Sequence, residues 1–168
     1  MASDTKPTDT PQSTAPRPAC VPPASEPLTP RQRFHQAAFY ARKVQEDAEQ
    51  QAAYQAATDD IVRSAYTVAV ADFLNAPNIR DVDLAAYHGQ KGDVITVYAT
   101  DDFAVHHVHL CIQNADGSLV EEGDAQADAD GTTFRYTATQ NNPSTDGDKI
   151  TVTAYDNPGN ATVEEQTL

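Results

Sequence analysis

Residues 76–168 form a succession of short segments in which apolar and polar side chains alternate, with turn residues between them. A period of two places successive side chains on opposite faces, which is typical of β-strands that bury one face. The pattern predicts seven strands, at residues 79–87, 94–100, 105–113, 118–122, 132–139, 149–155 and 161–167. The sequence Asn-Ala-Asp-Gly at residues 114–117 predicts a hairpin turn. Seven short strands in a segment of this length predict a mainly β fold, a Greek-key sandwich.

A short internal repeat supports this arrangement. Residues 92–102 and 147–157 are identical at seven of eleven positions. The two copies fall on the second and the sixth predicted strands. These are central strands of opposite sheets in a Greek-key sandwich, so similar surroundings explain the similar sequences.

Three motifs carry a resemblance to a known family. They are Gly-Asp-x-Ile-Thr-Val-x-Ala-x-Asp at 92–101, Val108-x-Leu110-x-Ile112 before the Asp-Gly turn, and Ala-Tyr-Asp-Asn-Pro-Gly-Asn at 154–160. Together they resemble bacterial immunoglobulin-like domains, over residues 77–168. The resemblance implies an immunoglobulin-like sandwich of the kind used in surface, phage and assembly proteins, and it implies no activity. The antibody hallmarks are missing, because the chain has no Trp and Cys111 is the only cysteine of this segment.

Two further regions precede the predicted sandwich. Residues 1–29 are rich in Pro, Thr, Ser and Ala, and this composition predicts a disordered arm, either a linker or an arm that orders on a partner. Residues 30–75 predict a helical segment, which begins with Thr29 as N-cap, Pro30 at the first position and Gln32 in a capping box.

The helical segment carries two stripes of apolar residues at helical spacing. The first contains Phe34, Ala38, Ala41, Val44, Ala48, Ala52 and Ala56, and the second contains Val62, Tyr66, Ala69, Val70 and Phe73. Thr58-Asp59-Asp60 lies between them, so we expect two helices, with one unbroken helix as the alternative. Tyr66, Val68 and Val70 also occupy every second position, so a β-strand is the alternative to a helix at residues 66–73. A stripe of alanines suits a close helix–helix contact, either with the next domain or with a second copy.

Charge is concentrated in the predicted sandwich. The whole chain has a formal net charge of −14, and residues 76–168 account for −12 of it, with four basic and sixteen acidic side chains. Such a chain repels phosphate, so we expect no binding to nucleic acid or to an anionic membrane surface. No apolar run is long enough to cross a bilayer, and residues 1–11 lack the pattern of a secretory signal. These features favour a cytoplasmic location and leave a surface or virion role open.

Acidic residues follow three strands whose loops gather at one end of a Greek-key sandwich. They are Asp101 and Asp102 after the second strand, Asp124, Asp128 and Asp130 after the fourth, and Asp156, with Asn157 and Asn160, after the sixth. Crowded carboxylates repel one another unless a cation or basic side chains lie among them. Oxygen ligands of this kind suit calcium. The alternatives are solvated turns, or pairing with Arg63 or Arg80 near the point where the helical segment joins the sandwich.

A second candidate metal site lies on the third strand. His107, His109 and Cys111 share one face of this strand, opposite the apolar face. Side chains on one face recur about every 6.6 Å, so two of them could bind zinc, copper or nickel if a neighbouring strand supplied further ligands. The alternative is an exposed polar face, with Cys111 covered by a neighbouring strand.

No catalytic motif for a nucleophile elbow, a phosphate-binding loop, a dinucleotide-binding loop or a zinc protease is present. Two cysteines are too few for a disulfide framework. We therefore expect a non-enzymatic structural or protein-binding module without a required cofactor. Its partner would be another protein or a second copy, contacted through the helices. A cation-binding module, with calcium or zinc, is the alternative.

Overall fold

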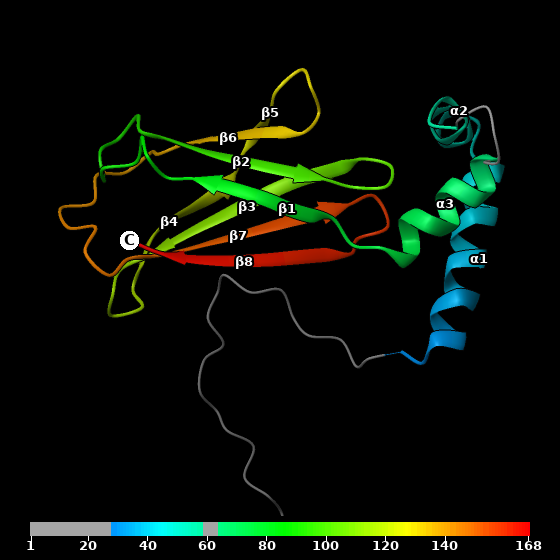
Figure 1. The fold of residues 1–168 in the computed structure, drawn as a ribbon, viewed down its shortest axis with the longest axis horizontal. Coiled ribbons are helices and arrows are strands. Elements are labelled where there is room, and N and C mark those ends of the chain that lie inside the picture. The colour runs from blue at the N-terminus through cyan, green and yellow to red at the C-terminus, as the bar shows by residue number, and fades with distance from the viewer. Residues whose placement is uncertain (1–27, 59–63) are drawn as a thin grey trace, which may run out of the picture.

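The computed structural model describes residues 28–58 and 64–168. Two antiparallel four-stranded sheets pack face to face, and a group of helices lies at one end of them (Figure 1). The strands are β1 (Asn78–Asp83), β2 (Val94–Thr100), β3 (Val105–Gln113), β4 (Leu119–Asp124), β5 (Gln126–Ala127), β6 (Thr133–Thr137), β7 (Lys149–Asp156) and β8 (Ala161–Thr167). One sheet has the order β1-β2-β6-β5, and the other has the order β4-β3-β7-β8. The predicted mainly β fold with two sheets is confirmed.

The number of strands differs from the predicted seven. The additional strand, β5, contains two residues that pair with Arg135 and Phe134 of β6, and a strand of two residues is too short to show alternation. The first strand ends at Asp83 rather than at residue 87. There the Asp83 side chain accepts the Ala85 amide at 2.9 Å, and the turn that follows takes the chain out of the sheet.

The apolar residues of strands in which apolar and polar side chains alternate form one core between the two sheets. It contains Val82, Tyr87, Ile95, Val97, Ala99, Val108, Leu110, Ile112, Phe134, Tyr136, Ala138, Ile150, Val152 and Ala154. The two copies of the internal repeat lie on β2 and β7, which are central strands of opposite sheets. Their shared sequence therefore reflects equivalent positions against this core, as predicted.

The described residues of the helical segment, 30–58 and 64–75, form three helices in place of the expected two. They are α1 (Pro30–Glu46), α2 (Ala48–Ala56) and α3 (Ala65–Leu74). The predicted capping box at Thr29 and Gln32 is present. The additional break lies at Asp47, whose extended backbone ends α1 and whose carboxylate accepts the first amides of α2. Of the predicted break at Thr58-Asp59-Asp60, Thr58 lies beyond the end of α2, and residues 59 and 60 lie outside the described residues. Residues 66–73 are helical rather than extended.

This break changes which residues of the alanine stripe are buried. Ala41 and Val44 pack into a small core with Tyr54 of α2 and with Val68 and Ala69 of α3. The alanines of α2 are exposed, because α2 leaves the axis of α1 at Asp47. The residues of the stripe therefore do not form one continuous surface.

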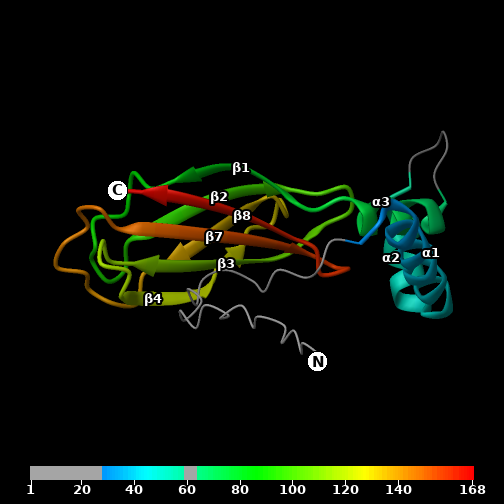
Figure 2. The same ribbon diagram turned by 90° about the horizontal axis from the view of Figure 1, so that it is seen from below.

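The helices lie beyond the end of the sandwich where the β2–β3 and β7–β8 loops turn, and a view rotated by 90° agrees (Figure 2). The amide of Asn160 fixes the end of α3 there, because its Nδ2 donates to the carbonyls of Phe73 and Asn75, both at 3.1 Å. Phe103, in the β2–β3 loop, stacks on the ring of Tyr54 with 4.0 Å between centroids. These contacts hold the end of α3 against the β7–β8 loop and Tyr54 of α2 against the β2–β3 loop.

Candidate functional site

Three carboxylates converge at the joint between the helical segment and the sandwich. Asp72 lies in the last turn of α3, Asp101 directly follows β2, and Asp156 ends β7. One oxygen from each lies within 4.8 Å of the other two. Asp72 is fully buried, Asp156 is 2 % exposed and Asp101 is half-buried. We call these three residues the acidic cluster.

Hydrogen bonds satisfy part of the acidic cluster. The Tyr54 hydroxyl donates to Oδ2 of Asp72 and accepts from the Tyr40 hydroxyl at 2.7 Å. Asp156 accepts the backbone amides of Gly159 at 2.8 Å and Asn160 at 2.6 Å. Oδ1 of Asp72 and Oδ1 of Asp101 are buried without a hydrogen-bond partner. When both carboxyl groups are ionised, these two acceptors lack a donor, which is costly for buried polar atoms, whereas a proton on Asp72 would let it donate to Asp101.

The electrostatics of the cluster favour an added positive charge. Within the described ranges, no Lys, Arg or His nitrogen lies within 4.0 Å of these three carboxylates. Burial raises the pKa of Asp72 to about 8, and a hydrogen bond to Asp101 and the charges of Asp101 and Asp156 act in the same direction, against the hydrogen bond from Tyr54. Burial also raises the pKa of Asp156, although its hydrogen bonds act in the opposite direction. Either a proton or a metal cation must offset the charge of this cluster.

The other predicted acidic residues lie apart from the cluster. Asp102 accepts from the side-chain amide of Asn75. Asp124 contacts His109 at 2.8 Å, and Asp128 forms a salt bridge with Arg135 at 2.9 Å. Asp130 accepts the backbone amides of residues 132 and 133, within the β5–β6 turn that projects from the side of the sandwich (Figure 1). The structure thus brings Asp101 and Asp156 together and separates them from Asp102, Asp128 and Asp130.

Of the two basic residues considered as partners of this pole, Arg80 is described by the structure, and it lines a pocket with Asp101 and Asp102 without a salt bridge to either. Nε of Arg80 donates to the Thr100 hydroxyl at 3.1 Å, and Arg80 forms no salt bridge with the acidic cluster. Arg63 lies outside the described residues. The helical segment contributes a carboxylate, Asp72, where a basic side chain was the expected internal partner.

The side chains of the predicted histidine site are held by different neighbours. His107 stacks on Tyr155 with 4.4 Å between ring centroids, and burial lowers its pKa. Nδ1 of His109 contacts Asp124 at 2.8 Å, and its Nε2 is 4.0 Å from Glu122. Cys111 is 1 % exposed, and the described part of the chain contains no free cysteine thiol. The structure does not bring these three residues together as a ligand set.

Sequence reasoning missed Asp72 and Tyr54. A signal for Asp72 was present, because it is the only charged residue of an otherwise apolar helix. It also lies in the last turn, where the helix dipole disfavours a negative charge. A carboxylate kept at such a position indicates a role other than helix stability.

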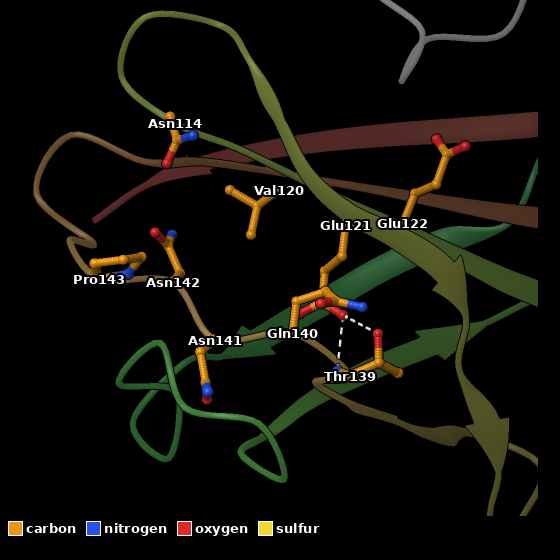
Figure 3. A pocket seen from close by; sticks show the side chains of 9 residues that line it. All are labelled: Asn114, Val120, Glu121, Glu122, Thr139, Gln140, Asn141, Asn142 and Pro143. Carbon is orange, nitrogen blue, oxygen red and sulfur yellow. Dashed lines mark hydrogen bonds between the residues drawn. The ribbon is translucent and has the colours of Figure 1, made fainter.

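A separate polar pocket lies at the opposite end of the sandwich (Figure 3). It has a volume of about 500 Å³ and is lined by Asn114, Val120, Glu121, Glu122, Thr139, Gln140, Asn141, Asn142 and Pro143. Within it, Glu121 is buried and accepts the Thr139 amide at 2.8 Å and the Thr139 hydroxyl at 2.7 Å. Glu121 and Glu122 face opposite sides of β4, as their adjacency on a strand predicts.

Comparison with known proteins gives no family. No family model matches the sequence, and no curated protein matches it. Among solved structures, it is similar to CopC from Methylosinus trichosporium OB3b, with 14% sequence identity over 53% of this chain and 87% of that chain, and a TM-score of 0.39. It is also similar to an engineered protein, with 19% identity over 43% of this chain and 15% of that one, and a TM-score of 0.31. TM-scores below 0.5 assign neither a fold family nor a function. No helix among the described residues has the length and apolar character needed to cross a membrane.

Proposed function

We propose that the protein is a non-enzymatic β-sandwich module that binds a metal cation, with calcium as the preferred ion, at the acidic cluster. One observation carries this proposal. Three carboxylates converge without a basic partner among the described residues, and two of their buried oxygens lack a hydrogen-bond donor when the cluster is ionised. A cation placed between them would satisfy both oxygens and offset the shared charge.

The donor set suits calcium better than a transition metal. All three side chains offer carboxylate oxygens, which hard cations prefer, whereas zinc and copper favour nitrogen and sulfur. Calcium binds oxygen at about 2.3–2.6 Å, so two oxygens on one ion are at most about 5 Å apart. The 4.8 Å limit of the cluster fits this range. Calcium also accepts irregular geometry, which suits ligands from a helix, a loop and the end of a strand.

The test is thermal unfolding of the full chain in calcium, in magnesium and in chelator. At 100 times its dissociation constant, a bound ion adds about 2.7 kcal/mol, which is readily seen as a higher melting temperature. We expect Asp101→Asn and Asp156→Asn to lose this shift. Asp146→Asn, which removes an exposed charge, is the matched control and should keep it. Identical melting temperatures in calcium and chelator would reject the proposal.

We propose further that the sandwich is immunoglobulin-like. The strand orders β1-β2-β6-β5 and β4-β3-β7-β8 support this. They correspond to the orders A-B-E-D and C′-C-F-G of that fold when strands are lettered along the chain. Because this fold carries many unrelated functions, it leaves the function to the site.

A second candidate function is protein binding or self-association through α1. It is favoured by two phenylalanines of this helix, Phe34 and Phe39, whose side chains are 60% and 57% exposed. Five positions separate these two residues, so they lie about 140° apart around the helix, and a partner that covered both would have to contact more than one side of α1. The partner would be another protein or a second copy of the chain.

The test of this candidate is light scattering of the full chain after size exclusion. If α1 mediates self-association, the wild type is a defined oligomer, and a Phe34→Ser, Phe39→Ser double variant has a lower mass. Gln45→Ser, at an exposed position of the same helix, controls for the change in helix propensity. A wild type that is monomeric at its highest soluble concentration would leave only a different partner protein for α1, and self-association would be rejected.

A further inference from the structure

The ligands of the acidic cluster come from two different parts of the molecule. Asp72 belongs to the helical segment, whereas Asp101 and Asp156 belong to the sandwich. We propose that calcium in the acidic cluster acts as a latch that holds the helical segment on the end of the sandwich. This inference rests on the proposed function, because it needs an ion that all three carboxylates bind.

The cluster opposes docking when it is empty and ionised. One oxygen from each carboxylate lies within 4.8 Å of the other two. When they are ionised, Asp72 on the helical segment and the two aspartates of the sandwich carry the same negative charge. The groups facing Asp72 are Asp101, Asp156 and the Tyr54 hydroxyl, and none of them supplies a positive charge. Repulsion between like charges is strong in a buried site, because water screens it little. A calcium ion converts this repulsion into three attractive contacts that span the joint.

The remaining contacts across the joint are few and mostly polar. The aromatic one is the stack of Phe103 on Tyr54, at 4.0 Å. The polar ones come from the Asn160 amide to carbonyls at the end of α3, and from Asn75 to Asp102. No salt bridge among the described residues joins the helices to the strands or their loops. Small polar contacts of this kind contribute modestly, so the charge state of the cluster can decide whether the joint stays closed.

The joint is also incompletely packed. A pocket of about 360 Å³ lies directly beside the cluster, lined by Tyr40, Gln50, Ala53, Tyr54, Phe103 and Asn157. Its walls come from α1, α2, the β2–β3 loop that contains Asp101 and the β7–β8 loop that follows Asp156. Opening the joint would enlarge this pocket and expose the rings of Tyr54 and Phe103. Loss of the ion would therefore uncover an aromatic surface that the latched form buries.

The experiment measures ion binding and docking separately in the full chain. Isothermal titration with calcium chloride at pH 8 measures binding. Hydrogen exchange with mass spectrometry measures docking, in peptides that cover residues 70–77, 101–104 and 156–160, with calcium or with chelator. We expect calcium to slow exchange in these peptides by about tenfold or more, while peptides from the central strands β3 and β7 change little.

Two variants test whether the carboxylates of the acidic cluster are responsible for the effect of calcium on the joint. Asp72→Asn removes one ligand and one charge, so it should weaken calcium binding and keep the joint protected even in chelator. The exposed Asp146→Asn should behave as the wild type does. Because the wild type is compared with itself in calcium and chelator, the test does not depend on the folding of the Asp72 variant.

The outcomes separate the latch from the proposed function. Binding together with slower exchange at the joint supports the latch. Binding with unchanged exchange overturns the latch and leaves the cation-binding function in place. Calcium affinity in Asp72→Asn equal to that of the wild type also overturns it, because the helical segment would then supply no ligand. Absence of binding in every protein overturns both proposals.

Discussion

In chelator, the protein loses stability as the pH rises from about 5 to about 9, and Asp72→Asn removes most of this loss. The cause is the buried carboxyl of Asp72, whose pKa is raised from 3.8 to about 8 in the folded protein. Between these two values the folded protein holds a proton that the unfolded chain has released. Each rise in pH therefore favours the unfolded chain, and the contribution is lost as the pH passes through the folded pKa.

The expected loss of stability follows from the difference between the pKa values of Asp72 in the unfolded and the folded protein. One pKa unit corresponds to about 1.4 kcal/mol, so a shift of this extent amounts to several kcal/mol across the range. Asp156 acts in the same direction, because burial raises its pKa as well. Equilibrium unfolding in urea at pH 5, 7 and 9 measures the effect. Asp146→Asn should retain the wild-type pH dependence, since this side chain is exposed.

The dependence of stability on pH, measured again in calcium, checks the role of Asp72. An ion that binds the ionised cluster replaces the proton, so calcium should stabilise the protein more at pH 9 than at pH 5. If Asp72→Asn has the same pH dependence as the wild type, the buried carboxyl does not determine it. If calcium acts equally at both pH values, the ion does not compete with the proton at Asp72.

The alternation of apolar and polar side chains was sufficient to predict the sandwich. Successive side chains of a strand point to opposite faces, so a strand with one buried face must have apolar residues at every second position. The inward residues of β2, β3 and β7 follow from sequence spacing alone. The two-residue strand β5 could not be predicted in this way, since its pairing with β6 depends on where the chain returns after β4. The break at Asp47 was missed for a different reason. Both sides of it consist of strong helix formers, and one capping side chain ends the helix.

The candidate site was predictable in part. Topology places Asp101 and Asp156 at the same end, because they follow central strands of the two sheets. It does not place Asp128 and Asp130 there, since β5 and its turn project to the side. Asp72 depends on how the helical segment docks, which is a tertiary property that no local pattern encodes. The histidine strand shows the converse case, because a shared strand face does not bring His107 and His109 to common partners.

The acidic cluster and Glu121 differ in how their charges are satisfied, although both are buried carboxylates. Oε2 of Glu121 accepts three donors, from the Tyr136 hydroxyl at 2.9 Å and from the amide and hydroxyl of Thr139. Oε1 of Glu121 is buried without a partner, as are Oδ1 of Asp72 and Oδ1 of Asp101. The difference is that Glu121 is a single carboxylate that holds a loop to the sheet through three donors on one oxygen, whereas three carboxylates converge in the acidic cluster.

Glu121→Ala is therefore expected to destabilise the protein by about 1–3 kcal/mol. The substitution leaves the buried Tyr136 hydroxyl without an acceptor, whereas the donors of Thr139, which is exposed, can turn to water. Glu121→Gln keeps an acceptor oxygen and should cost less. Glu122→Ala, on the exposed face of the same strand, is the matched control and should change stability by no more than about 0.5 kcal/mol.

Tyr136 supplies a readout that is specific to this contact. Burial raises the pKa of Tyr136 well above its ordinary value, and the hydrogen bond and charge of Glu121 raise it further. Ultraviolet titration of the tyrosines should therefore show one residue that ionises at lower pH in Glu121→Ala than in the wild type. Equal destabilisation by Glu121→Ala and Glu122→Ala would mean that the buried carboxylate does not hold the residue 139 loop against β4. A loss of stability with an unchanged tyrosine titration would assign the effect to the lost side-chain volume, because the hydroxyl contact would then contribute little.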